Sequence, residues 1–488
     1  MNFDNSYSRL PNVFYKTSSP SHFQNPELIA FNQELAIDLG FKYQNYTQQE
    51  LAKIFSGQTM LAGSNFISLV YAAHQFGHFV PQLGDGRAIL IGEVISKTGK
   101  RFDLQLKGAG PTVYSRRGDG FSALGPVLRE YILSEFMNSI NIKTTRSLAA
   151  VITHENVYRE DVIPGGIFTR VASSHIRIGT FQYFYGQNDL ENLKILLNYS
   201  IQRHYPEIIN NASNEKDYPI LFLRQVIKAQ VDLVASWMSV GFIHGVMNTD
   251  NMSISGETID YGPCAFMDYF NYNQVYSFID RNSRYSYINQ SNIMAWNLAR
   301  LADTLVPIIK DNFSETDQFA VALLEKELSS IKMQFEDIFN KKISKKLGLE
   351  HSSIDDNIKS KMISEFFQTL SDNKLDYTTS FRKLSAGLLT GNIDKNLSLF
   401  FNNWKNLLLN GNCNLEQISQ EMDLINPAII PRNHMVEKMI NLALAGDLSL
   451  LHQMIEIYKN PFIENSIDPV LGLPPSEDEI VANTFCGT

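Results

Sequence analysis

Abundant cysteine, an excess of basic charge and long apolar runs are all missing from this chain of 488 residues, and each absence excludes a class of protein. Its three cysteines are too few for the disulfide framework on which small secreted domains depend. Aspartate and glutamate (51) outnumber lysine and arginine (42), and a net charge of −9 argues against a general nucleic-acid binder. No run of about 18 uncharged apolar residues occurs, so we expect no transmembrane helix.

Targeting signals and several catalytic motifs are missing as well. The segment from Met1 to Asn5 has neither the basic and apolar regions of a signal peptide nor the arginine-rich pattern of a mitochondrial presequence, so we expect a cytoplasmic protein. A Walker A motif is lacking, since Gly108-Ala109-Gly110 follows Lys107 instead of preceding a lysine, and no G-x-S-x-G elbow occurs. The histidines show no metal-ligand spacing, so we expect no zinc site and a purely structural His244.

A loop with the residue pattern of a kinase catalytic centre spans His244 to Asn251 and is followed by Asp260-Tyr261-Gly262. Protein kinases use H-R-D-L-x-x-x-N and then D-F-G, in which the first Asp accepts a proton and the Asn and second Asp hold Mg²⁺. Here Val246 replaces the proton acceptor, whereas Asn251 and Asp260 keep the positions of the metal ligands. The pattern predicts a metal site without the usual base. Taken alone, it is equally typical of a buried helix, turn and strand.

A β-hairpin with a glycine-rich entrance precedes this loop in the chain. Gly84-Asp85-Gly86-Arg87 leads into the apolar run 88–95, and after a turn the alternating residues 101–107 end at Lys107. Glycines let backbone N–H groups approach phosphate oxygens, and a strand lysine adds a point charge. We therefore expect Lys107 to face a nucleotide.

Apolar residues at helical spacing predict a helix over residues 122–140 that carries Glu130. A kinase holds its strand lysine with a glutamate from a helix at this point in the chain, so Glu130 is the candidate partner of Lys107. Arg170 and Arg177 are expected on a strand and at a strand edge. Outside a nucleotide site, such glutamates and arginines are usually solvated or paired with opposite charges.

Five sequence blocks between about residues 60 and 290 resemble the selenoprotein O family, whose members have a kinase-like fold. The blocks are Gln105 to Thr112, Tyr114 to Gly120, Gly165 to Ala172, His175 to Arg177, and His244 to Asn251 with Asp260 to Pro263. The resemblance implies an α+β, protein-kinase-like bilobal fold, with a β-rich nucleotide lobe, a helical catalytic lobe, and N-terminal and helical C-terminal extensions. It also implies transfer of AMP, rather than phosphate, from ATP to Ser, Thr or Tyr hydroxyls of proteins, with release of pyrophosphate.

The resemblance further implies a nucleotide bound in the reverse of the kinase orientation, with its γ-phosphate where kinases hold adenine. Arginine forks suit such a phosphate. By similarity, the residues that contact the nucleotide are Gly84, Gly86, Arg87, Lys107, Asp119, Gly120, Arg170, Arg177 and Asp260. Asn251 and Asp260 are the expected ligands of Mg²⁺, with Mn²⁺ as the alternative metal. Asp250 is the expected proton acceptor, and Lys107 and Glu130 complete the catalytic set.

Two other functions stay open at this point. A conventional kinase is disfavoured by Val246 and by the additional arginines, and a silent ATP-binding scaffold would bind nucleotide without releasing pyrophosphate. The expected partners are ATP and acceptor proteins, and we expect neither nucleic acid nor membrane as a partner. The identity of the acceptors and the oligomeric state stay open. A mitochondrial location also stays open as the alternative to the cytoplasm, because the family has mitochondrial members.

The chain divides by pattern into four expected segments. They are an N-terminal extension (1–80) with helices expected over 48–55 and 64–76, a kinase-like nucleotide lobe (81–180), a catalytic lobe (181–300), and a helical C-terminal extension with a flexible tail (301–488). Of the cysteines, Cys264 is expected to be a buried small hydrophobe. Cys486 near the chain end resembles the C-terminal selenocysteine or cysteine of the family, for which a redox role and an inert thiol are both open.

Overall fold

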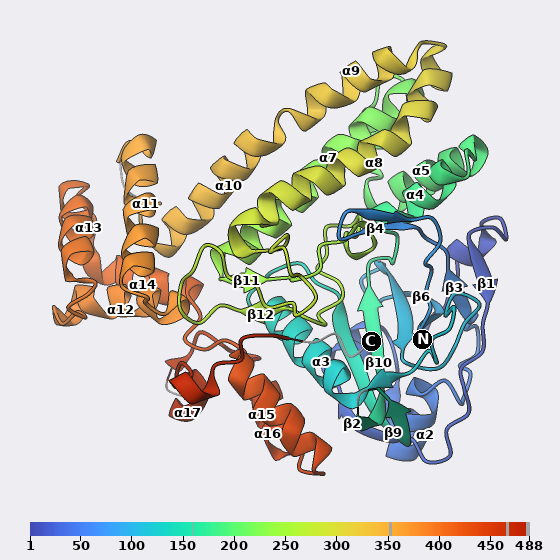
Figure 1. The fold of residues 1–488 in the computed structure, drawn as a ribbon, viewed down its shortest axis with the longest axis horizontal. Helices are drawn as coiled ribbons and strands as arrows, with labels where there is room; N and C mark the ends of the chain where they lie inside the picture. The colour runs from blue at the N-terminus through green and yellow to red at the C-terminus, as the bar shows by residue number, and fades with distance from the viewer. Residues whose placement is uncertain (160, 351–353, 465–467, 485–488) are drawn as a thin grey trace.

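An eight-stranded antiparallel sheet lies toward one end of the molecule (Figure 1). The computed structural model describes residues 1–159, 161–350, 354–464 and 468–484. The strand order is β1-β3-β6-β7-β10-β9-β2, with β8 paired to β10. The strands are β1 (Tyr15–Thr17), β2 (Glu27–Phe31), β3 (Ile67–Leu69), β6 (Ala88–Ile95), β7 (Arg101–Lys107), β8 (Ser122–Ala123), β9 (Arg146–Tyr158) and β10 (Val162–Ala172). Two further two-stranded sheets are formed by β4 (Ala73–Gln75) with β5 (His78–Val80) and by β11 (Phe242–Ile243) with β12 (Ala265–Phe266).

The alternation of side chains along β7 gives the sheet two different faces. Leu104 and Leu106 join an apolar cluster beneath α1 (Gln33–Asp38) and α2 (Gln48–Phe55), whereas Gln105 and Lys107 point to the opposite face. That opposite face is covered by α3 (Leu124–Ser139), which packs on β9 and β10. The sheet therefore presents the polar side chains of β7 to α3.

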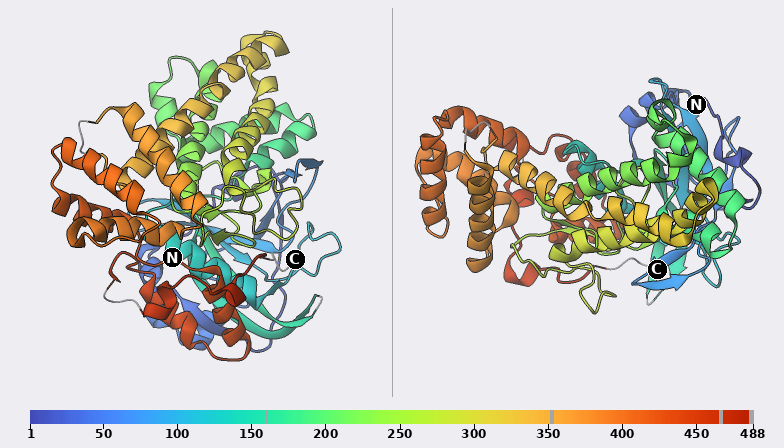
Figure 2. Two further views of the ribbon diagram at one scale, coloured as in Figure 1. Left: turned by 60° about the vertical axis from the view of Figure 1, so that its left-hand side comes forward. Right: turned by 90° about the horizontal axis from the view of Figure 1, so that it is seen from above.

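Helices make up the rest of the chain. α7, α8, α9 and α10 extend away from the sheet, and α11 to α14 gather at the end remote from it (Figures 1 and 2). α15 returns to pack on α3. The helices are α4 (Ile178–Gly186), α5 (Leu190–His204), α6 (Glu207–Asn211), α7 (Tyr218–Ser239), α8 (Gln290–Phe313), α9 (Asp317–Leu328), α10 (Ile331–Lys346), α11 (Asp356–Asp372), α12 (Tyr377–Thr390), α13 (Ser398–Asn410), α14 (Leu415–Ile425), α15 (Asn433–Leu444), α16 (Ser449–Ile457) and α17 (Pro469–Gly472). None of the described helices combines the length and hydrophobicity that crossing a bilayer requires.

The expected hairpin and the helices over 48–55 and 122–140 are confirmed by β6, β7, α2 and α3. The helix expected over 64–76 is wrong, because this segment forms β3 and β4. Ile67, Ser68 and Leu69 are all buried, since β3 is flanked by β1 and β6 and covered on both faces. With three residues each, β3 and β4 are too short for the alternation over about four to eight residues that indicates a strand. Cys264 is buried as expected, and Cys486 lies outside the described residues.

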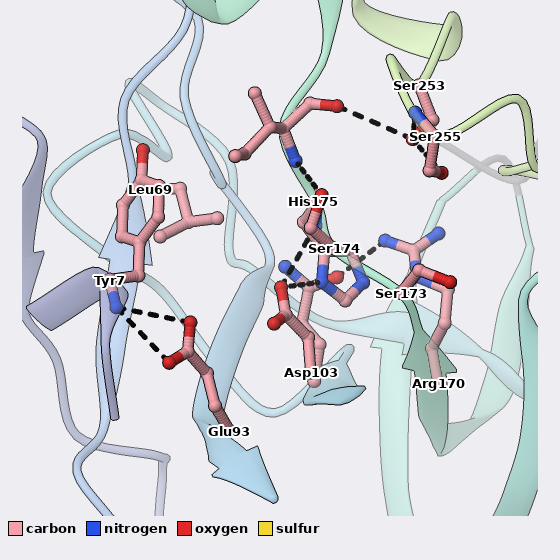
Figure 3. Close-up of polar contacts among 12 residues, drawn as sticks. Tyr7, Leu69, Glu93, Asp103, Arg170, Ser173, Ser174, His175, Ser253 and Ser255 are labelled. Atoms are coloured by element: carbon pink, nitrogen blue, oxygen red, sulfur yellow. Dashed lines mark hydrogen bonds and ion pairs between the residues drawn. The ribbon is translucent and has the colours of Figure 1, made fainter. Parts of the chain in front are cut away.

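A buried ionic cluster anchors α5 and the N-terminal segment to the sheet. Arg203 of α5 contacts Glu93 of β6 at 2.7 Å and also pairs with Asp103 of β7. Figure 3 shows the backbone nitrogen of Tyr7 donating to Glu93, and His175 donating to Asp103. Burial raises the pKa of Asp103, but Arg203 and His175 more than offset this and hold the pKa below its usual range. Arg203 thus neutralises two buried carboxylates.

We predict that Arg203→Met lowers the free energy of unfolding by about 3–5 kcal/mol, because it leaves buried Asp103 without an arginine partner and leaves buried Glu93 with Arg101 at 3.3 Å as its remaining cation. The matched control is Arg224→Met, which removes a half-exposed pair with Glu327 and should cost only ~0–1 kcal/mol. Thermal unfolding at one scan rate compares the two variants. Equal losses of stability in the two variants would show that the buried ionic cluster stabilises the fold no more than an exposed ion pair does.

Candidate active site

A cavity of about 790 Å³ gathers nearly all of the residues predicted from the sequence. Its lining includes Gly84, Gly86, Arg87, Lys107, Asp119, Gly120, Arg170, Arg177, Asp250, Asn251 and Asp260. These residues come from the hairpin entrance, the sheet and the loop before β12, so segments far apart in the chain meet here. The remaining predicted residue, Glu130, lies behind Lys107 on α3.

Lys107 joins the sheet, α3 and the loop around Asp260. Its Nζ lies 2.6 Å from Glu130 Oε2 and also donates to Asp260 Oδ1. Burial would raise the pKa of Asp260, but the charges of Lys107 and Arg87 outweigh it and hold that pKa well below its usual range. Asp260 is therefore ionised, and its backbone is held in the left-handed region at φ +67°. The expected Lys107–Glu130 contact is present.

Arg170 and Arg177 are buried against the cavity, at 3% and 5% exposure. Arg170 donates to Glu130 at 3.2 Å, and Arg177 donates to the backbone oxygen of Asp250 at 2.9 Å. The Nε atom of each arginine is buried and has no hydrogen-bond partner among the described residues. The two guanidinium groups bring two positive charges to the wall of one cavity, which favours an anionic ligand there.

Asp250 lies in the short turn η4 (Thr249–Asn251) and faces the same cavity. Burial raises the pKa of its carboxyl to about 6, although the charge of Arg177 lowers it. One of its oxygens, Oδ1, is buried without a hydrogen-bond partner among the described residues. A carboxylate with such a pKa can accept a proton near neutral pH.

Asn251 and Asp260 offer oxygen atoms for a metal ion. The amide nitrogen of Asn251 donates to Val246 O at 3.0 Å, which leaves its side-chain oxygen as the free acceptor. No group of three or more His, Cys, Asp or Glu side chains that could hold a metal occurs within the described residues.

Comparison with known proteins identifies the family of the chain. Residues 1–459 match the family described as "Protein adenylyltransferase SelO". The chain is 45% identical to a "Protein nucleotidyltransferase YdiU" of Bacillus thuringiensis and to one of Bacillus cereus, each alignment covering 100% of this chain and 98% of the relative. The chain belongs to the SelO family.

Three residues of this SelO-family site were missed by sequence reasoning. Asp85 stands between two glycines as an ordinary turn residue would, yet it is 1% exposed and lies 3.7 Å from Arg177. Tyr71 stacks under the Arg177 guanidinium at 4.4 Å, and Gln105 bridges Asp85 and Arg170. Of the three, only Gln105 could have been predicted, because it lies on the same side of β7 as Lys107.

Arg177 lies elsewhere than expected, whereas His244 has the expected structural role. Arg177 was expected at a strand edge, but it directly precedes α4 and forms only an isolated bridge with Ser253. Capping the start of a helix in this way turns its side chain toward Asp250. His244 is structural as expected, because it is buried, contacts Ile259 O at 2.9 Å and does not line the cavity.

Tyr114 shapes the glycine-rich entrance in the SelO-family chain. Gly84 has φ +70°, and a Cβ atom there would lie 2.4 Å from the Tyr114 ring. At Gly86 a Cβ would lie 3.0 Å from the Tyr114 backbone oxygen. The glycines thus let two segments of the cavity wall close on each other, and Asp119 is fixed nearby by Arg159 at 2.8 Å.

We predict that Gly84→Ala weakens ATP binding, whereas Gly99→Ala does not. Both glycines have positive φ, so both variants should lose about 1–2 kcal/mol of stability. Only at Gly84 does the new methyl meet a buried ring, which adds roughly 1–3 kcal/mol and displaces the cavity wall. Thermal unfolding and calorimetric ATP titration measure the two effects, and identical behaviour of the variants would contradict the prediction.

Proposed function

We propose that this protein is a Mg²⁺-dependent adenylyltransferase that moves AMP from ATP to Ser, Thr or Tyr hydroxyls of proteins and releases pyrophosphate. The observation that carries the proposal is the presence of Arg170, Arg177 and Asp250 in one cavity with the Lys107–Glu130 pair. The names of the SelO and YdiU relatives support nucleotidyl transfer. Val246 at the usual kinase base position disfavours ordinary phosphate transfer.

The proposal includes a protein-kinase-like bilobal arrangement. Residues 81–180 would form the nucleotide lobe and residues 181–300 the catalytic lobe, with residues 301–488 as a helical extension. Support comes from a strand lysine paired with a glutamate of a helix, followed by a loop with Asn251 and Asp260. The first 80 residues would extend the nucleotide lobe, since β1, β2 and β3 join its sheet.

The nucleotide would be inverted relative to its orientation in a kinase. Arg170 and Arg177 would bind the γ-phosphate, and their place at the cavity wall supports this because guanidinium groups suit phosphate oxygens. Gly84, Gly86, Arg87, Asp119 and Gly120 would contact the rest of the nucleotide. Lys107, held by Glu130, would add a positive charge beside the phosphates.

The metal would be held by Asn251 and Asp260. When bound, Mg²⁺, or Mn²⁺ in its place, would neutralise phosphate charge and favour departure of pyrophosphate. Asp260 is already ionised by its cationic surroundings, which suits a metal ligand.

The acceptor hydroxyl would give its proton to Asp250. The hydroxyl oxygen forms a bond to the α-phosphorus, the bond from that phosphorus to the bridging oxygen breaks, and pyrophosphate carries away the electron pair. The Arg177 guanidinium donates to the backbone oxygen of Asp250 at 2.9 Å and so holds this turn in place. Its positive charge also opposes the rise that burial causes in the pKa of the Asp250 carboxyl. Positioning and charge stabilisation then supply most of the rate.

Intact-mass analysis of protein acceptors after incubation with ATP and Mg²⁺ tests the proposal. An AMP-sized increment together with released pyrophosphate supports it. A phosphate-sized increment would favour a conventional kinase. Bound nucleotide with neither modification nor pyrophosphate across a whole-cell set of acceptors would favour a silent scaffold.

We predict that Asp250→Ala lowers turnover by roughly 10²–10⁴-fold and changes ATP affinity much less, because a general base acts in the transition state. Pyrophosphate release measures turnover, and calorimetry measures affinity. If both fell in proportion, Asp250 would be a binding residue.

We predict that replacing Arg170 and Arg177 together with Ala weakens ATP far more than AMP and leaves adenosine almost unaffected. The lost charge-assisted hydrogen bonds, each worth about 1.5–3 kcal/mol, would belong to the distal phosphates. The control replaces Arg116 and Arg117, which are exposed and line the same cavity, and should lose less because exposed charges are screened. A uniform loss across the three ligands would refute the inverted orientation.

A further inference from the structure

A continuous chain of polar contacts runs behind the cavity from Arg177 to Lys107. Asp85 lies 3.7 Å from Arg177 and accepts from Gln105 at 3.0 Å. Gln105 in turn accepts from Arg170 at 2.6 Å. Arg170 then reaches Glu130 at 3.2 Å, and Glu130 reaches Lys107 at 2.6 Å. Arg177 and Arg170 are therefore connected to each other through the buried side chains of Asp85 and Gln105.

Gln105 occupies the middle of this chain. It is fully buried on β7, directly opposite Arg170 of β10, and it is not among the residues that line the cavity. Opposite residues of an antiparallel pair project from the same face, so the two side chains are neighbours by register. Gln105 therefore acts on the cavity only through the residues it contacts.

The chemistry of the amide explains why a glutamine suits this place. One end of the side chain must donate to the Asp85 carboxylate, and the other must accept from the Arg170 guanidinium. A neutral amide carries both a donor and an acceptor, whereas a carboxylate only accepts and an ammonium only donates. Glutamate at this position would place a second buried carboxylate against Asp85.

We propose that Gln105 is a positioning residue that fixes the separation of Arg170 and Arg177 and thereby sets the preference for a triphosphate over a monophosphate nucleotide. The inference rests on the proposed function, because it takes the two arginines as the holders of the terminal phosphate. Asp85 is the second positioning residue, because its carboxylate accepts from Gln105 and lies beside Arg177.

Loss of the amide would affect the two arginines differently. Arg170 would keep only Glu130, which Lys107 already shares, and its guanidinium would gain freedom. Asp85 Oδ2 would keep only the backbone N–H of Leu69, so the carboxylate that faces Arg177 through Oδ1 would be held less firmly. Both changes alter the spacing of the forks on which bidentate phosphate binding depends.

The test measures ATP and AMP affinity calorimetrically, and KM and kcat for ATP, in Gln105→Met. We expect ATP affinity to fall roughly tenfold or more, as loss of a hydrogen bond to a charged group implies, with AMP affinity nearly unchanged. KM for ATP should rise more than kcat falls. Gln105→Asn should behave alike, because an amide shorter by one methylene cannot reach Asp85 and Arg170 together, and it serves if the first variant does not fold.

The matched control is Asn426→Leu, which removes another buried amide. Asn426 donates to Lys346 O and Met422 O, both at 2.9 Å, within the C-terminal helices. It should lose stability and keep the wild-type ratio of ATP to AMP affinity. An unchanged ratio in both Gln105 variants, or an equal loss for ATP and AMP, would overturn the inference.

Intact-mass analysis of the wild-type reaction separates this inference from the proposed function. If the wild type transfers AMP and the Gln105 variants keep its affinity ratio, only the positioning role fails. If the wild type transfers phosphate instead, the proposed function fails, and a changed ratio in the Gln105 variants would still support their role in spacing the arginines.

Discussion

The ion pair between Lys107 and Glu130 is the contact on which the rest of the site depends. It ties the hairpin to α3 and, through Asp260, to the loop before β12. Glu130 also holds Arg170, so one buried carboxylate orients two cations. Breaking a buried pair is costly because it leaves an uncompensated charge, and here the loss would spread to both ends of the cavity.

Opposite environments separate the two carboxylates of the cavity. Asp260 faces Lys107 and Arg87, which hold its pKa far below the usual range, whereas burial dominates at Asp250 and raises its pKa to about 6. Environments that separate the pKa values of two acids in this way commonly give the acids different roles in catalysis. An ionised Asp260 suits a metal, and Asp250 suits proton transfer, which agrees with the proposed adenylyl transfer.

The sequence predicted the parts of the site that follow local patterns. Lys107 ends an alternating strand, whereas Glu130 was indicated by its helix together with its place in the chain between that strand and the catalytic loop. Gln105 was not predicted, because its partner Arg170 lies 65 residues away and their contact depends on β7 pairing with β10. The segment 64–76 was predicted as helix because its two strands, β3 and β4, have only three residues each and are too short to give a clear strand period.

The central claim is that the electrophile is the α-phosphorus of an inverted ATP. Parallel incubation of the protein and its acceptors with ATP labelled with radioactive phosphorus at either the α or the γ position tests it most directly. We expect label on protein only from α-labelled ATP, with loss of that label in Asp260→Ala. Label transferred from the γ position would show phosphate transfer instead.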